Sequence, residues 1–139
     1  MTFGSLNYLA IVIAAVAAFA LGAVYYGALG KPWMKAARID PATHRQTALP
    51  MPLLLLTSIV CELVMAVLLA GLIGHLSAGD PTLKIGVITG FFVWLGFMAT
   101  TLTVNQRYQG FGWTLTLIDS VHWLLVALAM GAILGWMGV

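Results

Sequence analysis

Asp119 and His122 stand three residues apart in the last apolar stretch of the chain. On a helix this spacing puts a carboxylate and an imidazole side by side on one face, where they could pass a proton or hold a cation. A third ionisable residue, Glu62, lies about eleven residues into another apolar stretch, near the expected middle of a membrane. A charge at that depth costs on the order of 3 kcal/mol, so Glu62 should be protonated, paired or hydrated.

Hydroxyl groups at similar expected depth could assist these three residues. Two carboxyls close together would share a proton, and a neighbouring imidazole could accept one. Such a cluster could relay protons or hold a cation, and it would also suit a divalent metal. In the alternative, Glu62 bonds to Ser58 or a threonine, His122 bonds to Asp119, and the cluster only fixes helix register. The candidate intramembrane polar cluster is Glu62, Asp119, His122, Ser58, Thr100, Thr103, Tyr25 and Tyr26.

The composition is that of an integral membrane protein. The chain of 139 residues is 62% hydrophobic and 7% charged, too few charges to cover a water-soluble domain. The net charge of +2, without a basic run interleaved with aromatics, argues against nucleic-acid binding. Cys61 is the only cysteine, so neither a disulfide within the chain nor a thiolate metal site is expected. We predict no metal and no cofactor.

Four apolar stretches are long enough to cross a bilayer: residues 6–29, 51–76, 83–104 and 114–138. The sequence therefore predicts one domain, residues 1–139, folded as an all-α bundle of four transmembrane helices. Residues 30–50 would form an interfacial loop. Four crossings place both termini on the same side of the membrane.

The positions of lysine and arginine predict which side that is. The first and third loops hold Lys31, Lys35, Arg38, Arg45 and Arg107, whereas the opposite face has only Lys84. By the positive-inside rule the basic loops are cytoplasmic, and the termini face the periplasm or exterior of a bacterial inner membrane.

The first loop should also contact lipid. Pro32 suits the first turn of a short helix that would lie in the headgroup layer of the bilayer. The residues assigned to this lipid interface are Lys31, Trp33, Lys35 and Arg38.

Small residues recur at four-residue spacing in all four stretches. Such rows let helix backbones approach closely, which is how helices associate in lipid. They predict packing faces and favour a homo-oligomer or a subunit of a larger membrane complex. The residues assigned to helix packing are Ala14, Ala18, Gly22, Ala66, Ala70, Gly74, Gly86, Gly90, Ala127, Gly131 and Gly135.

Several short segments resemble the bacterial membrane family called domain of unknown function 1761. The matching segments are Asn7-Tyr8-Leu9-Ala10, Gly22 with Tyr26, Lys31 with Trp33-Met34-Lys35, Trp94-Leu95-Gly96-Phe97 with Ala99-Thr100-Thr101, and Met130-Gly131-Ala132-Ile133-Leu134. The resemblance covers nearly the whole chain and implies four transmembrane helices, with no established activity. It also implies that the positions of Asp119 and His122 more often hold an amide and an aromatic residue, so this pair would be particular to this chain or a subgroup.

Three classes of function are compatible with these features. The first expectation is a small multi-pass membrane protein that serves as a self-associating structural or accessory subunit. The alternative is a proton- or cation-coupled transporter or channel, formed by an oligomer, that uses Glu62, Asp119 and His122. A membrane enzyme would use His122 with a carboxylate as acid and base. Because no nucleophile motif, phosphate loop or dense metal-ligand spacing supports an enzyme, we do not predict one.

Overall fold

The computed structural model describes residues 6–42 and 49–139. Within these ranges every regular element is a helix and no strand is present, so the predicted all-α fold is confirmed. Arg45, counted among the basic loop residues, lies outside the described residues. The elements are α1 (Tyr8–Ala36), α3 (Met51–Leu76), α4 (Leu83–Val93), the π-helical turn η2 (Trp94–Ala99), α5 (Thr100–Tyr108) and α6 (Trp113–Met137).

Because α4, η2 and α5 follow one another without a break, the described part of the chain forms four long helices. They contain 29, 26, 26 and 25 residues, and each is apolar enough to cross a membrane. At 1.5 Å per residue even the shortest is about 37 Å long, which exceeds the hydrocarbon core of roughly 30 Å. The predicted multi-pass architecture of four membrane helices is confirmed.

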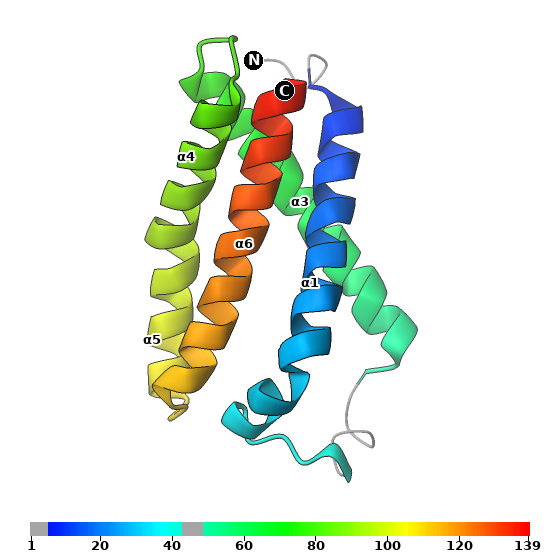
Figure 1. The fold of residues 1–139 in the computed structure, drawn as a ribbon, viewed down its shortest axis with the longest axis vertical. Coiled ribbons are helices and arrows are strands. Elements are labelled where there is room, and N and C mark those ends of the chain that lie inside the picture. Colours follow the sequence, from blue (N-terminus) through cyan, green and yellow to red (C-terminus); the bar gives the residue numbers. More distant parts are fainter. Residues whose placement is uncertain (1–5, 43–48) are drawn as a thin grey trace.

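The start of α1 and the end of α6 lie at the same end of the bundle, here called the termini end (Figure 1). Asn7 joins them: its side-chain oxygen accepts a hydrogen bond from the Ala10 N–H, and its Nδ2 donates to the Met137 carbonyl over 3.1 Å. The α5–α6 connection and the last turns of α1 lie at the opposite end (Figure 1). We call this the basic end because it carries Lys31, Lys35, Arg38 and Arg107.

Two helices extend further toward the basic end than the sequence predicted. α1 continues to Ala36, so Pro32 lies inside it and does not begin a separate helix. Proline has no N–H to complete that turn, and the last turns of α1, in cyan, change direction (Figure 1). The third span similarly runs to Tyr108 instead of residue 104. Both predicted ends were too early because apolar runs stop where polar side chains begin, while the helical backbone continues.

Glycines bring α4 and α6 into backbone contact. A Cβ atom added at Gly86 would lie 2.0 Å from the Gly131 carbonyl oxygen, and one added at Gly131 would lie 2.2 Å from the Gly86 carbonyl oxygen. One turn further along, a Cβ at Gly90 would lie 2.3 Å from the Ala127 carbonyl oxygen. Only hydrogen fits at these places. Since lipid is as apolar as leucine, close packing of this kind is a main source of helix association in a membrane.

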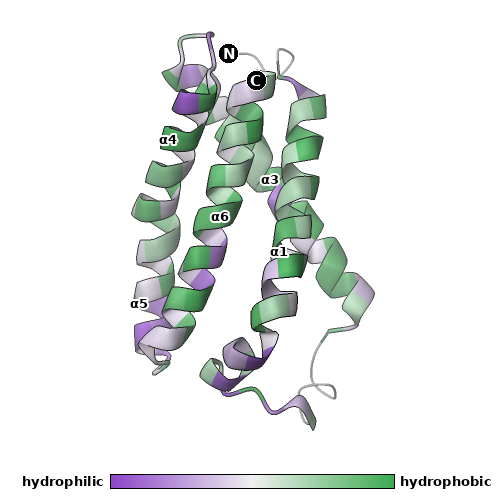
Figure 2. Ribbon diagram, in the orientation of Figure 1, coloured by the Kyte–Doolittle hydropathy of each residue, from purple (hydrophilic) through white to green (hydrophobic). Residues whose placement is uncertain are grey.

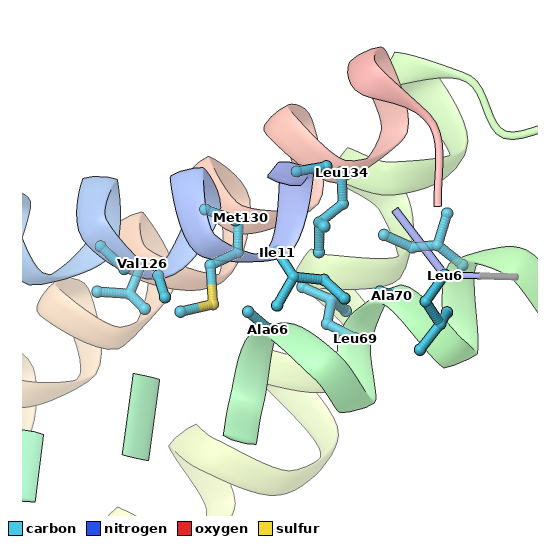
Figure 3. Packing of buried hydrophobic residues seen from close by; sticks show 13 residues of the cluster. Leu6, Ile11, Ala66, Leu69, Ala70, Val126, Met130 and Leu134 are labelled. Atoms are coloured by element: carbon cyan, nitrogen blue, oxygen red, sulfur yellow. The ribbon is translucent and has the colours of Figure 1, made fainter. Parts of the chain in front are cut away.

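Small residues also pack α1 and α3 into the core. Ala14 and Ala18 of α1 and Ala66 and Ala70 of α3 are fully buried. Figure 3 shows Ala66, Ala70 and Leu69 meeting Ile11, Met130 and Leu134, which come from α1 and α6.

The packing rows are therefore used inside a single chain. Alongside the four alanines, Gly74, Gly86, Gly90, Ala127, Gly131 and Gly135 are all buried. A second copy of the chain cannot reach these surfaces, so they do not support the self-association that the sequence suggested.

α3 packs against the bundle over only part of its length. Its buried residues begin at Glu62 and continue to Gly74, whereas residues 51–58 are all exposed. In Figure 1 this first part of α3 points away from α1 and α6. Figure 2 shows that it is largely as hydrophobic as the packed part, which suits contact with lipid. Glu62 therefore lies where α3 leaves the other helices.

Candidate functional site

Asp119 of α6 is bound by three side chains from two other spans. Its Oδ1 accepts hydrogen bonds from the Tyr26 hydroxyl and the Trp33 indole Nε1, both over 2.9 Å. Its Oδ2 accepts one from the Gln106 Nε2 over 2.7 Å. All three partners are donors, which matches the acceptor-only character of a carboxylate. Asp119 therefore links α1, α5 and α6 near the basic end.

Two of these donors were not predicted. Trp33 was assigned to the lipid interface, but its indole reaches Asp119 because α1 continues and bends past Pro32. Gln106 was placed in a loop, whereas it lies within α5 and is buried. The sequence offered one signal for these donors, namely that a carboxylate inside an apolar span needs hydrogen-bond donors and that both residues are expected at the same end of the bundle as Asp119.

The other residues assigned to the lipid interface have different positions. Lys31 and Lys35 are exposed. Arg38 donates a hydrogen bond from Nη2 to the Gly110 carbonyl over 2.8 Å, and its guanidinium lies 5.7 Å from the centre of the Phe111 ring. Arg38 thus ties the chain after α1 to the α5–α6 connection.

Three predicted hydroxyl donors bond to backbone carbonyls of their own helix. Thr100 donates to Gly96, Thr103 to Ala99 and Ser58 to Leu54, over 2.7–3.0 Å. This is the usual behaviour of hydroxyls in membrane helices.

The remaining two predicted donors are the tyrosines of α1. The Tyr25 hydroxyl donates to the Ile118 carbonyl over 2.8 Å. Of the five predicted hydroxyl donors, Tyr26 is the one that reaches a carboxylate of the cluster, namely Asp119.

His122 is buried without a hydrogen-bond partner. It is 5% exposed, and neither Nδ1 nor Nε2 has a partner. Aromatic rings surround it, with ring centres 4.7 Å away at Tyr26 and 4.9 Å away at Trp123. Gly22 makes room for the imidazole, because a Cβ at that position would lie 3.1 Å from Nε2. The expected bond between His122 and Asp119 is not formed.

Glu62 is also buried with a free oxygen. It is 6% exposed and its Oε2 has no hydrogen-bond partner. A buried polar group without a partner costs about 1–3 kcal/mol, so it needs an explanation such as water, an ion or a functional role.

Glu62 and His122 border the same cavity, which has a volume of about 410 Å³ and lies between α1, α3 and α6. Asp119, Thr100, Thr103 and Tyr25 do not line it. Most of the lining is apolar or aromatic, as in most small-molecule sites. The lining residues are Phe19, Gly22, Ala23, Tyr26, Leu55, Thr57, Ser58, Cys61, Glu62, His122 and Trp123.

The structure therefore divides the predicted polar cluster into two parts. Asp119 belongs to a hydrogen-bonded group near the basic end, while Glu62 and His122 belong to the cavity. Tyr26 contacts both, because it donates to Asp119 and lines the cavity. Among residues 6–42 and 49–139, no three side chains of the metal-binding kinds are grouped closely enough to hold a metal ion.

A carboxyl and an imidazole in an apolar cavity can take up protons or bind a cation. Searches of the curated proteins and of the solved structures gave no match. A family model described as "protein of unknown function (DUF1761)" matches residues 9–135, which is most of the chain. The chain therefore belongs to that family, as its sequence segments suggested.

Proposed function

We propose that this protein exchanges protons or cations within the membrane, and that Glu62 and His122 are the exchanging groups. The observation that carries the proposal is that both side chains are buried, have unpartnered polar atoms and line one cavity. Ionisable residues inside a membrane are costly and usually mark a route for protons, ions or substrate.

A purely structural role for Glu62 has less support. Hydrogen bonds between membrane helices contribute only about 0.6 kcal/mol on average, and Glu62 Oε2 makes none. An apolar residue at this position would pack without any desolvation cost, so bundle stability gives no reason for a carboxyl. Asp119, in contrast, has three donors and needs no role beyond tying the helices together.

The shape of α3 supports access to the cavity. Residues 51–58 are exposed and three of them, Leu55, Thr57 and Ser58, line the cavity, so the cavity could be reached along this part of α3. Protons or ions could enter from the basic end without crossing the packed glycine and alanine contacts. A single chain thus provides the site, and an oligomer is not needed to form it.

We also propose that the basic end faces the cytoplasm in a bacterial inner membrane. Lys31, Lys35, Arg38 and Arg107 lie at that end, whereas Lys84 lies near the other. The positive-inside rule favours this orientation.

Proton flux through reconstituted protein tests the function. Liposomes containing the chain and a trapped pH-sensitive dye would receive a potassium diffusion potential to drive proton entry. We expect faster acidification than in empty liposomes, and Glu62→Gln should lower the rate by tenfold or more because its amide cannot exchange a proton.

Asp80→Asn is the matched control, since it removes a carboxyl in the α3–α4 connection, away from the cavity. It should keep the wild-type rate. Equal rates for Glu62→Gln and wild type, with both folded, would overturn the proposal.

A further inference from the structure

We propose that the cavity beside Glu62 binds a lipophilic primary amine in its protonated form. The ammonium group would lie at Glu62 and His122, and the apolar part would lie among Phe19, Tyr26 and Trp123. This inference deepens the proposed function and rests on it, because it names the class of cation that exchanges at the site.

The walls of the cavity favour an organic cation over a metal ion. Calcium takes six to eight oxygen ligands, and magnesium needs a near-octahedral set that includes several waters. Here the cavity offers one carboxylate, Glu62, whereas its other side chains are largely carbon. Ser58 already donates its hydroxyl proton to its own helix. An ion with its own hydrocarbon part matches this lining better than a bare ion.

Aromatic rings supply a second attraction for such a ligand. Phe19, Tyr26 and Trp123 come from two helices and all line the cavity. Ring faces attract ammonium groups, and tryptophan does so most strongly. The same rings would pack against the hydrocarbon part of an amine.

His122 makes the site suited to a primary amine and less suited to a quaternary one. A neutral imidazole has one nitrogen that accepts and one that donates. Glu62 Oε2 and the accepting nitrogen of His122 both lack a partner, so a ligand that reaches them would find two acceptors for its N–H groups. A primary ammonium has three N–H groups, whereas a quaternary ammonium has none.

The depth of the site indicates a free amine as the source of the ammonium group, not a lipid headgroup. Glu62 lies eleven residues beyond Met51, which is about 16 Å along α3. Headgroups remain at the surface of the bilayer, whereas a lipophilic amine dissolves in its interior. The exposed first part of α3 opens the cavity toward that interior.

Cys61 provides a direct way to measure occupancy. It is exposed, lines the cavity, immediately precedes Glu62 in α3 and is the only cysteine in the chain. An uncharged thiol reagent, methyl methanethiosulfonate, would be added to the chain in nanodiscs of phosphatidylcholine, a lipid whose headgroup carries no primary ammonium. Intact mass would follow the rate of modification.

We expect saturating 2-phenylethylammonium to slow Cys61 modification at least tenfold. The uncharged 2-phenylethanol, with nearly the same shape, should slow it less than twofold. Equal protection by the two compounds, or none by either, would overturn the proposal. This comparison uses only the wild-type chain, so it does not depend on any variant folding.

Variants and a lipid control then locate the ammonium. Glu62→Gln should abolish the difference between amine and alcohol, and Asp80→Asn should preserve it. Trp123→Leu should raise the half-protecting concentration about fivefold, as expected for loss of a cation–π contact. Protection by phosphatidylethanolamine alone, without added amine, would identify a headgroup as the occupant and overturn the assignment to a free amine.

The two proposals can fail separately. If the amine protects Cys61 but no proton flux is measured, the amine-binding proposal stands and the proton-exchange proposal is overturned. If proton flux is measured but the amine does not protect Cys61, the proton-exchange proposal stands and the amine-binding proposal is overturned.

Discussion

The two ends of the bundle are held together by different means. At the termini end, glycines bring α4 and α6 into backbone contact, and fully buried alanines pack α1 and α3 into the core. At the basic end, α3 has left the bundle, and side-chain hydrogen bonds centred on Asp119 join the other spans. Glu62 and His122 lie between these regions. Close packing thus holds one end and hydrogen bonding holds the other, and the unpartnered atoms of Glu62 and His122 lie between the two ends.

The largest effect should come from the glycine contacts of the termini end. Gly86→Ala places a methyl group 2.0 Å from the Gly131 carbonyl oxygen, and a backbone atom cannot move aside as a flexible side chain would. We expect the free energy of unfolding in detergent to fall by about 3 kcal/mol, at the upper end of typical overpacking costs. Reversible unfolding followed by circular dichroism would measure it.

Gly71→Ala is the control for that substitution, because nothing lies within 4 Å of an added Cβ at that position. Its stability should stay the same or rise, since alanine favours helix over glycine by up to about 1 kcal/mol. Equal losses for Gly86→Ala and Gly71→Ala would show that close backbone contact does not hold this end.

The hydrogen bonds of the basic end should give a smaller effect. Asp119→Asn turns one acceptor oxygen into an N–H donor that would face the donors of Tyr26 and Trp33 or of Gln106. We expect a loss of about 2 kcal/mol, typical of a buried donor left unpaired.

Trp33→Phe removes a single donor and should cost less, near the average of about 0.6 kcal/mol for hydrogen bonds between membrane helices. Thermal unfolding of both variants would compare the two losses. If Asp119→Asn lowers the stability no more than Trp33→Phe does, Asp119 is not the centre of the hydrogen bonds at this end.

The smallest effect should have the opposite sign. Glu62→Met replaces an unpartnered buried carboxyl by an apolar side chain of similar length, so we expect the bundle to gain about 1 kcal/mol. A group that lowers stability is expected where function requires it. Detergent unfolding of Glu62→Met beside wild type would measure the change, and a clear loss would mean that Glu62 holds helices together.

Much of the architecture could be predicted from the sequence. The second span matched its observed bounds, Met51–Leu76, because proline and polar residues flank an uninterrupted apolar run. The small-residue rows were visible at four-residue spacing. The helices that pack against these rows could not be predicted, since spacing shows which face of a helix carries small residues but not which helix covers that face.

The polar site was harder to predict. The three ionisable residues were identified by residue type, because each is expensive in lipid. Their division into Asp119 on one side and Glu62 with His122 on the other depends on where Trp33 and Gln106 lie, and both came from segments predicted to be loops. The hydropathy of the sequence could not predict that the first part of α3 lies away from the bundle, since a helix facing lipid and a helix facing protein are equally apolar.

The two parts of α3 are consequently subject to different sequence constraints. Before Glu62 the residues that face lipid need only be apolar, so leucine, isoleucine and phenylalanine should be interchangeable at positions 53, 54 and 56, whereas Leu55 also lines the cavity. Beyond Glu62 the same helix must fit the surfaces of its neighbours, where Ala66 and Ala70 are fully buried. One continuous helix thus has a first part whose lipid-facing residues can be exchanged for other apolar residues and a second part whose residues must fit the neighbouring helices. Glu62 lies at the boundary between the two parts.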